Sequence, residues 1–212
     1  MQPSSPAADC PICPRLAQFR ADNRITYPSF YNGAVPAFGE ISANLLIVGL
    51  APGLKGANAT ARPFTGDYAG DVLYASLLKC GLASGTYNKS ADDGLTLQGV
   101  RITNAVRCVP PENKPTGAEI NACNSFLTSE IAAMPTLRVI LSLGSISHKA
   151  VLKALGYKQA AYAFGHGCEH MLNNGIMLVS SYHCSRYNIN TGKLTQTMFD
   201  AVIQRAKSLM LE

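Results

Sequence analysis

The sequence predicts an α/β protein, a three-layer α/β/α sandwich with a central, mainly parallel sheet of about four strands. Two observations lead to this prediction. Short apolar runs alternate along the chain with longer amphipathic segments, and such alternation produces right-handed crossovers and a parallel sheet with helices on both faces. The 212 residues, 47% hydrophobic and 15% charged, suffice for one domain with a sizeable core, whereas two domains would be cramped. We therefore expect a single domain over residues 1–212.

The predicted strands are short apolar runs, as expected in a sheet that is buried on both faces. They span residues 44–48, 100–106, 137–141 and 176–179. In an open sheet of this kind, ligands bind outside the carboxyl ends of the strands. The loops after Val48, Thr103, Leu141 and Ser181 all open at that edge, so we expect the functional site there.

Helices are predicted where apolar residues recur at helical spacing. They span residues 15–23, 71–80, 118–134, 144–155 and 194–211. Gly81 ends the second helix, and Thr116 caps the third in a capping box that Glu119 completes. A polar, hairpin-like stretch with residues 92–94 at its turn follows the second helix. Residues 24–43 form a predicted surface loop.

The charge balance favours a polyanionic partner without naming one, since the net charge is +5 and the pI is near 8.8. The first nine residues contain neither a basic n-region nor an apolar h-region, which argues against a secretory signal. No apolar run approaches the roughly 18 residues that span a bilayer. We therefore expect a soluble, cytoplasmic monomer with no membrane partner.

Four of the seven cysteines fall into two pairs, Cys10 with Cys13 and Cys108 with Cys123. A Cys-x-x-Cys turn lets two thiolates reach one metal centre, and two further cysteines complete a four-thiolate site. Zinc ribbons usually use two close pairs. The long spacing between Cys108 and Cys123 is less like zinc and is tolerable for a 4Fe-4S cluster. Buried free thiols are the alternative.

Three side chains at the predicted active edge are suited to nucleic-acid chemistry. Phe64 lies in a polar loop, where an aromatic ring either stacks on a base or plugs the loop. Asn104 ends the second strand and offers one donor and one acceptor, unless it only forms a turn. His183 follows the last strand beside Ser185 and Arg186, which are groups that hold a phosphate; a polar turn with an incidental histidine is the alternative.

Familiar nucleotide and hydrolase motifs are absent from the sequence. The first strand is followed by neither a P-loop nor a Gly-x-Gly-x-x-Gly pattern, and Pro52 removes a backbone donor that a pyrophosphate needs, so a redox dehydrogenase is disfavoured. The chain also lacks Gly-x-Ser-x-Gly, which makes Ser185 a poor candidate for a nucleophile.

Four motifs together resemble the uracil-DNA glycosylase superfamily, specifically its iron-sulfur, type-B branch (family 5). The resemblance spans nearly the whole chain, and the four paired cysteines come in the expected order. The motifs are Gly49-Leu50-Ala51-Pro52-Gly53, Arg62-Pro63-Phe64-Thr65-Gly66-Asp67, Thr103-Asn104-Ala105-Val106-Arg107-Cys108 and residues 183–195.

The resemblance implies a uracil-DNA glycosylase-like fold and a monofunctional enzyme, a hydrolase that acts on N-glycosyl bonds. Its partner would be DNA containing deaminated bases, from which it would release uracil and also hypoxanthine and xanthine, leaving an abasic site. Its cofactor would be a structural 4Fe-4S cluster held by an N-terminal Cys-x-x-Cys segment and two further cysteines. The ligands would be Cys10, Cys13, Cys108 and Cys123.

Individual roles also follow from the resemblance. Phe64 would stack on the flipped base, with Gly49 and Ala51 beside it. Asn104 would read the polar edge of the base. His183 would stabilise the negative charge that develops on the departing base.

The expected site also needs a carboxylate that orients water. In other branches an Asp or Glu just after the first motif's glycine has this role, but Leu50 and Ala51 stand there in this chain. We assign the role to Asp67, which lies in a loop at the active edge. Because the first-motif carboxylate is missing, a catalytically weak iron-sulfur nucleic-acid-binding module is the alternative function. A small-molecule hydrolase on the same fold is a third.

Ser185 and Arg186 are expected to clamp phosphates beside the flipped nucleotide. Lys55 stands where much of the branch has histidine, and we expect it to contact DNA. Cys184 stands where the family commonly has proline.

Overall fold

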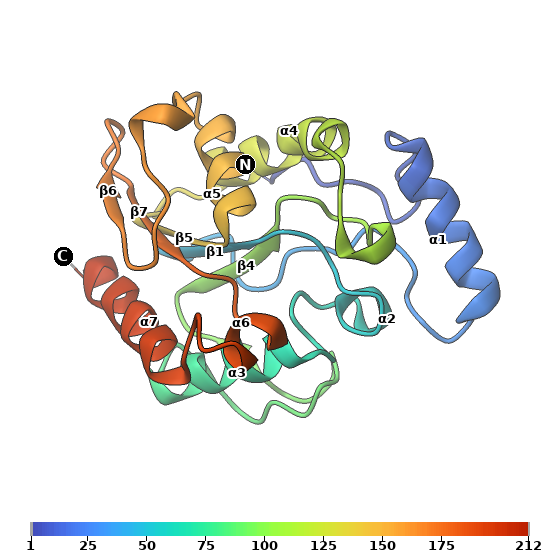
Figure 1. Ribbon diagram of the computed structural model, residues 1–212, viewed down its shortest axis with the longest axis horizontal. Coiled ribbons are helices and arrows are strands. Elements are labelled where there is room, and N and C mark those ends of the chain that lie inside the picture. The colour runs from blue at the N-terminus through green and yellow to red at the C-terminus, as the bar shows by residue number, and fades with distance from the viewer. Residues whose placement is uncertain (1, 212) are drawn as a thin grey trace.

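The computed structural model describes residues 2–211 as a five-stranded sheet between two layers of helices (Figure 1). The strands lie in the order β4-β1-β5-β7-β6. Four of them run parallel: β1 (Leu45–Gly49), β4 (Val100–Asn104), β5 (Val139–Leu143) and β7 (Met177–Ser181). Strand β6 (Glu169–Met171) pairs antiparallel with β7 at one edge. The mainly parallel α/β sandwich is confirmed, with one strand more than the four predicted.

The central strand β1 shows why both faces of the sheet need helices. Leu45 and Ile47 pack into one apolar core, while Leu46 and Val48 pack into the other. This alternation follows from the two-residue period of a strand. An uninterrupted apolar run is therefore the expected sequence of a strand buried on both sides.

The first core lies under α3 (Tyr68–Lys79) and α7 (Gln196–Leu211), and the second under α4 (Gly117–Ala133) and α5 (Ser145–Ala154). Helix α3 begins three residues earlier than predicted because Asp67 caps it. The capping box of Thr116 and Glu119 at the start of α4 is confirmed. Helix α1 (Pro14–Thr26) lies apart from the sheet, on the right in Figure 1.

Short elements fill the connections. The predicted hairpin is confirmed as the pair β2 (Ala83–Ser84) and β3 (Thr96–Leu97). Residues 186–190, which lie outside the predicted helices, form a short helix, α6 (Arg186–Asn190), because Ser185 caps it. The remaining short helices are α2 (Ala57–Thr60), η1 (Pro111–Asn113) and η2 (Gln159–Ala161). Within residues 2–211, no helix is long and apolar enough to cross a membrane.

Candidate active site

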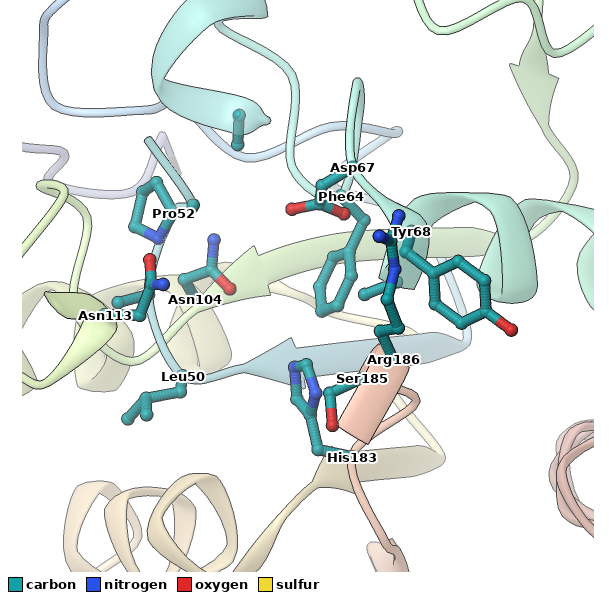
Figure 2. A pocket seen from close by; sticks show the side chains of 14 residues that line it. Leu50, Pro52, Phe64, Asp67, Tyr68, Asn104, Asn113, His183, Ser185 and Arg186 are labelled. Carbon is teal, nitrogen blue, oxygen red and sulfur yellow. The ribbon is translucent and has the colours of Figure 1, made fainter. Parts of the chain in front are cut away.

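A cavity of about 370 Å³ opens beside the carboxyl ends of β1, β4 and β7, at the edge of the sheet that the sequence predicted (Figure 2). Seven predicted site residues line it: Ala51, Phe64, Asp67, Asn104, His183, Ser185 and Arg186. Gly49 lies behind this lining, and the exposed Lys55 lies outside it. Tyr68 and Asn113 also line the cavity, and sequence reasoning missed both.

Phe64 is held in a backbone conformation that a bulky residue rarely adopts. Its φ is +54°, in the left-handed region. The Tyr87 hydroxyl donates to the Phe64 carbonyl at 3.3 Å. A Cβ at Gly70 would lie 1.7 Å from that carbonyl oxygen, so only glycine fits there. The ring thus faces His183, with 6.1 Å between ring centroids and 28° between planes.

A buried ion pair fixes the loop that carries Phe64. Both terminal nitrogens of Arg62 donate to the Asp93 carboxylate at 2.8 Å. The guanidinium also lies over the rings of Tyr74 and Tyr87. Arg62 and the backbone N–H groups of Asn88 and Leu95 hold the pKa of Asp93 far below its ordinary value. The β2–β3 hairpin lies outside the cavity lining. Through the Arg62–Asp93 ion pair it nevertheless holds the Phe64 ring inside the cavity.

The side-chain amide of Asn104 faces the cavity from the end of β4 (Figure 2). The residue is only 3% exposed, yet no group within residues 2–211 hydrogen-bonds its amide. The amide is open to the cavity and is therefore available to a ligand. Gly49 permits this arrangement, because a Cβ there would lie 2.4 Å from Oδ1 of Asn104 and 2.5 Å from Cζ of Phe64.

Asp67 caps α3 and lines the cavity at the same time. Its Oδ1 accepts from the backbone N–H of Gly70 at 3.0 Å. Its Oδ2 lies against two glycines, since a Cβ would lie 2.9 Å from it at Gly53 and 2.4 Å at Gly56. One carboxylate oxygen is thus used by the helix, and the other lies in a glycine-lined notch of the cavity wall.

His183 projects into the cavity from the loop after β7 (Figure 2). Burial lowers the pKa of its imidazole from the ordinary value, and the nearby Asp67 carboxylate only partly opposes this effect. The neutral form of the ring is therefore favoured. Asn188, on α6, fixes the backbone by donating from Nδ2 to the His183 carbonyl at 2.8 Å.

The next residue, Cys184, points the other way. It is fully buried in the core under α3 and α7, and its thiol donates to the Ala69 carbonyl in the first turn of α3 at 3.5 Å. Burial raises the pKa of this thiol, so the thiol stays protonated. A small, weakly donating side chain therefore joins the histidine loop to α3.

Two further predicted residues lie at the mouth of the cavity. The Ser185 hydroxyl accepts from the backbone N–H of Asn188 at 3.3 Å and so caps α6. The Arg186 guanidinium lies over the ring of Tyr68 at 5.2 Å and is exposed to solvent. A cation at the open side of the cavity is positioned to meet an anionic ligand.

The four paired cysteines line a second, apolar cavity between α1, the loop after β4 and α4. Buried Arg20 donates to Sγ of Cys108 at 3.5 Å, so a cation lies beside the thiols. Among the described residues, no group of three His, Cys, Asp or Glu side chains lies close enough to hold a single metal ion. In a four-iron cluster each thiolate bonds a different iron, which requires a wider set of sulfurs. Four thiols, an apolar surrounding and a buried cation fit such a cluster.

Comparison with known proteins identifies the family of the chain. Residues 36–207 match the model of the uracil DNA glycosylase superfamily. The chain is 42% identical to the type-5 uracil-DNA glycosylase of Thermus thermophilus, over 94% of this chain and 93% of that protein. It is 40% identical to the type-5 enzyme of Pyrobaculum aerophilum, over 93% and 88% of the two chains. A type-4 uracil-DNA glycosylase of Pyrobaculum aerophilum is 36% identical over 60% of this chain and 57% of its own length. The chain belongs to the uracil-DNA glycosylase superfamily.

Proposed function

We propose that this protein is a monofunctional DNA glycosylase of base excision repair, which hydrolyses the N-glycosidic bond of uracil in DNA and leaves an abasic site. Relatives named type-5 uracil-DNA glycosylases match nearly the full chain. The observation that carries the proposal is the amide of Asn104, which makes no hydrogen bond within residues 2–211 and faces the cavity beside an aromatic ring and a neutral imidazole. We take residues 1–212 as one domain that acts as a monomer.

The cavity walls recognise a base that has left the duplex. A base inside the stack is unreachable, and the few kcal/mol that extrusion costs favour mismatched or damaged positions. Phe64 stacks on the face of the extruded base, and Asn104 pairs with its polar edge through one donor and one acceptor. Gly49 keeps these two groups close to each other, and Ala51 leaves room beside them.

His183 acts on the charge that the reaction creates. As the glycosidic bond breaks, the sugar becomes cationic and negative charge builds on the base oxygen. A preorganised donor aimed at that oxygen stabilises this state. The lowered pKa keeps the imidazole neutral, so one ring N–H donates to the base without protonating it.

Asp67 acts on the sugar side of the glycosidic bond. Its Oδ2 orients the attacking water and stabilises the sugar cation, while Oδ1 keeps its bond to Gly70. This assignment replaces the first-motif carboxylate that Leu50 and Ala51 do not provide. Ser185 and Arg186 contact the phosphates on either side of the extruded nucleotide, and exposed Lys55 contacts the DNA farther out.

Cys10, Cys13, Cys108 and Cys123 hold a 4Fe-4S cluster. The cluster, when bound, supplies a structural cross-link between segments distant in sequence. Arg20 offsets part of its negative charge, and the surrounding apolar side chains exclude water from the sulfurs.

The substrate range is tested with four duplex oligonucleotides, each carrying a single uracil, hypoxanthine, xanthine or thymine. Base release is measured as strand cleavage at abasic sites after mild alkali. We expect release of uracil, with hypoxanthine and xanthine also accepted by the large cavity. No uracil release above a heat-inactivated control at neutral pH would refute the proposed activity.

A further inference from the structure

Two buried asparagines, Asn32 and Asn58, join each other behind the cavity wall. Their side chains are 1% and 0% exposed, and Nδ2 of Asn58 donates to Oδ1 of Asn32 at 2.9 Å. Two backbone bonds run alongside, from Asn32 to the Asn58 carbonyl and from Tyr31 to the Ala59 carbonyl, both at 3.1 Å. Helix α2 is therefore fixed to residues 31–32 by three hydrogen bonds.

On one side, this contact is tied to α1. The Nδ2 of Asn32 also donates to the carbonyls of Tyr27 at 2.8 Å and Phe30 at 3.2 Å, which follow the end of that helix. The other half of α1 is held by buried Arg20, which donates to the Cys10 carbonyl at 3.0 Å. The helix that begins at the Cys-x-x-Cys turn is thus linked through Asn32 to α2.

On the other side, the contact reaches the cavity. The backbone N–H of Asn58 donates to the Gly53 carbonyl at 3.1 Å, and Gly53 and Ala57 both line the cavity. Gly53 and Gly56 form the notch that receives Oδ2 of Asp67. The position of α2 therefore determines where the backbone of residues 53–56 contacts the Asp67 carboxylate.

We propose that the Asn32–Asn58 contact positions the cavity wall at residues 53–58 against Asp67, with Asn58 as the positioning residue. This inference rests on the proposed function, since uracil excision is its main readout. A displaced wall moves the carboxylate and its water but leaves the phosphate contacts of Ser185 and Arg186 in place. The loss therefore falls on the chemical step and not on DNA affinity.

The test compares Asn58→Ala with the matched control Asn124→Ala. Asn124 is also buried, and its Nδ2 donates to the Ala150 carbonyl at 2.9 Å between α4 and α5, outside the cavity lining. Each change removes one buried amide hydrogen bond. Three quantities are measured: the single-turnover rate constant of uracil release, the Kd for a duplex with uncleavable 2′-fluorinated deoxyuridine, and hydrogen exchange of the amides of residues 53–60.

Asn58→Ala is expected to slow release roughly 10- to 100-fold, with little change in Kd and with faster exchange at residues 53–60. Asn124→Ala is expected to change none of the three. Asn58→Gln keeps the amide but displaces it by one methylene group, and we expect the same pattern from it should the alanine variant not fold.

Native excision by a folded Asn58 variant would overturn the proposal, as would an equal loss in Asn124→Ala. A wild-type protein that releases no uracil would refute the proposed function instead. In that case the hydrogen-exchange data still test the positioning role of Asn58. Unchanged exchange at residues 53–60 in Asn58→Ala would overturn the proposal.

Discussion

Asp67 has two tasks that a pair of substitutions can separate. One oxygen caps α3, and the other is proposed to orient water. Asn is as good an N-cap as Asp, whereas Ala is not. Asp67→Asn is therefore expected to keep the free energy of unfolding near the native value, while Asp67→Ala loses about 1 kcal/mol.

Both variants are expected to excise uracil at least about 100-fold more slowly, because neither has the carboxylate. Urea unfolding and single-turnover excision, measured on the same preparations, test this expectation. An Asn variant with native excision would show that Asp67 only caps the helix.

The sequence predicts those site residues that combine a suitable side chain with a position at or after the end of a strand. Asn104 lies at the end of a predicted strand, Phe64 and His183 lie in loops after predicted strands, and all three line one cavity. Tyr68 and Asn113 give no such signal, because they reach the cavity through the turn of α3 and through a left-handed backbone in η1. Lys55 fits the general basic pattern but lies outside the cavity lining.

Among the elements, the β2–β3 hairpin has a larger effect on the site than its length suggests. It carries Asp93, whose ion pair with Arg62 is buried on both sides. Removing one partner of a buried pair leaves an unpaired charge, so Asp93→Asn is expected to lower the free energy of unfolding by about 3 kcal/mol. Excision should fall as well, because Arg62 precedes Phe64 in the same strained loop.

The acid sensitivity of the protein gives a second readout of this pair. The folded-state pKa of Asp93 lies far below its ordinary value of 3.8, so the pair stabilises the fold above about pH 4. That stability is lost as the pH falls further. The Asp93→Asn variant should lack this pH-dependent part of the free energy of unfolding. Urea unfolding at a series of pH values measures it, with the exposed Asp92→Asn as control. Equal stability of the two variants would contradict the account.

Element prediction succeeds where a pattern is long enough to be periodic. The four parallel strands and the long helices follow apolar runs and helical spacing, with boundaries displaced by a few residues. Strand β6 has only three residues, and its side chains are half-exposed or exposed. Helix α6 depends on a single cap, Ser185. Their sequences lack the repeated apolar positions that reveal a buried face.

For the whole molecule, the cysteine site links the N-terminal segment to the sheet and to α4. Anaerobically prepared protein is expected to be yellow-brown, with visible absorption that bleaches on reduction. Cys123→Ser should lose most of this colour, because one of the four proposed ligands is removed. Cys80→Ser is the matched control, since Cys80 is a free, half-buried thiol outside this cavity. A colourless wild-type protein that contains zinc would refute the cluster.

The identity of the whole molecule was predictable from the sequence because four motifs occur in family order. The motifs do not reveal the contacts that support them: the ion pair of Arg62 with Asp93, the core contact of Cys184 with Ala69 and the contact of Asn32 with Asn58. These join segments that are far apart in the chain, so only the folded structure brings them together.

The most direct test of the central claim is the single-turnover rate constant of uracil release by His183→Ala, measured together with its affinity for uncleavable uracil-containing DNA. We expect release to fall at least about 100-fold with nearly unchanged affinity, because the proposed role of His183 is to stabilise charge that appears only as the bond breaks. His170→Ala, whose ring bonds the Ala163 carbonyl away from the cavity lining, should behave as wild type. Native release by His183→Ala, or equal losses of release and affinity, would contradict the assigned role.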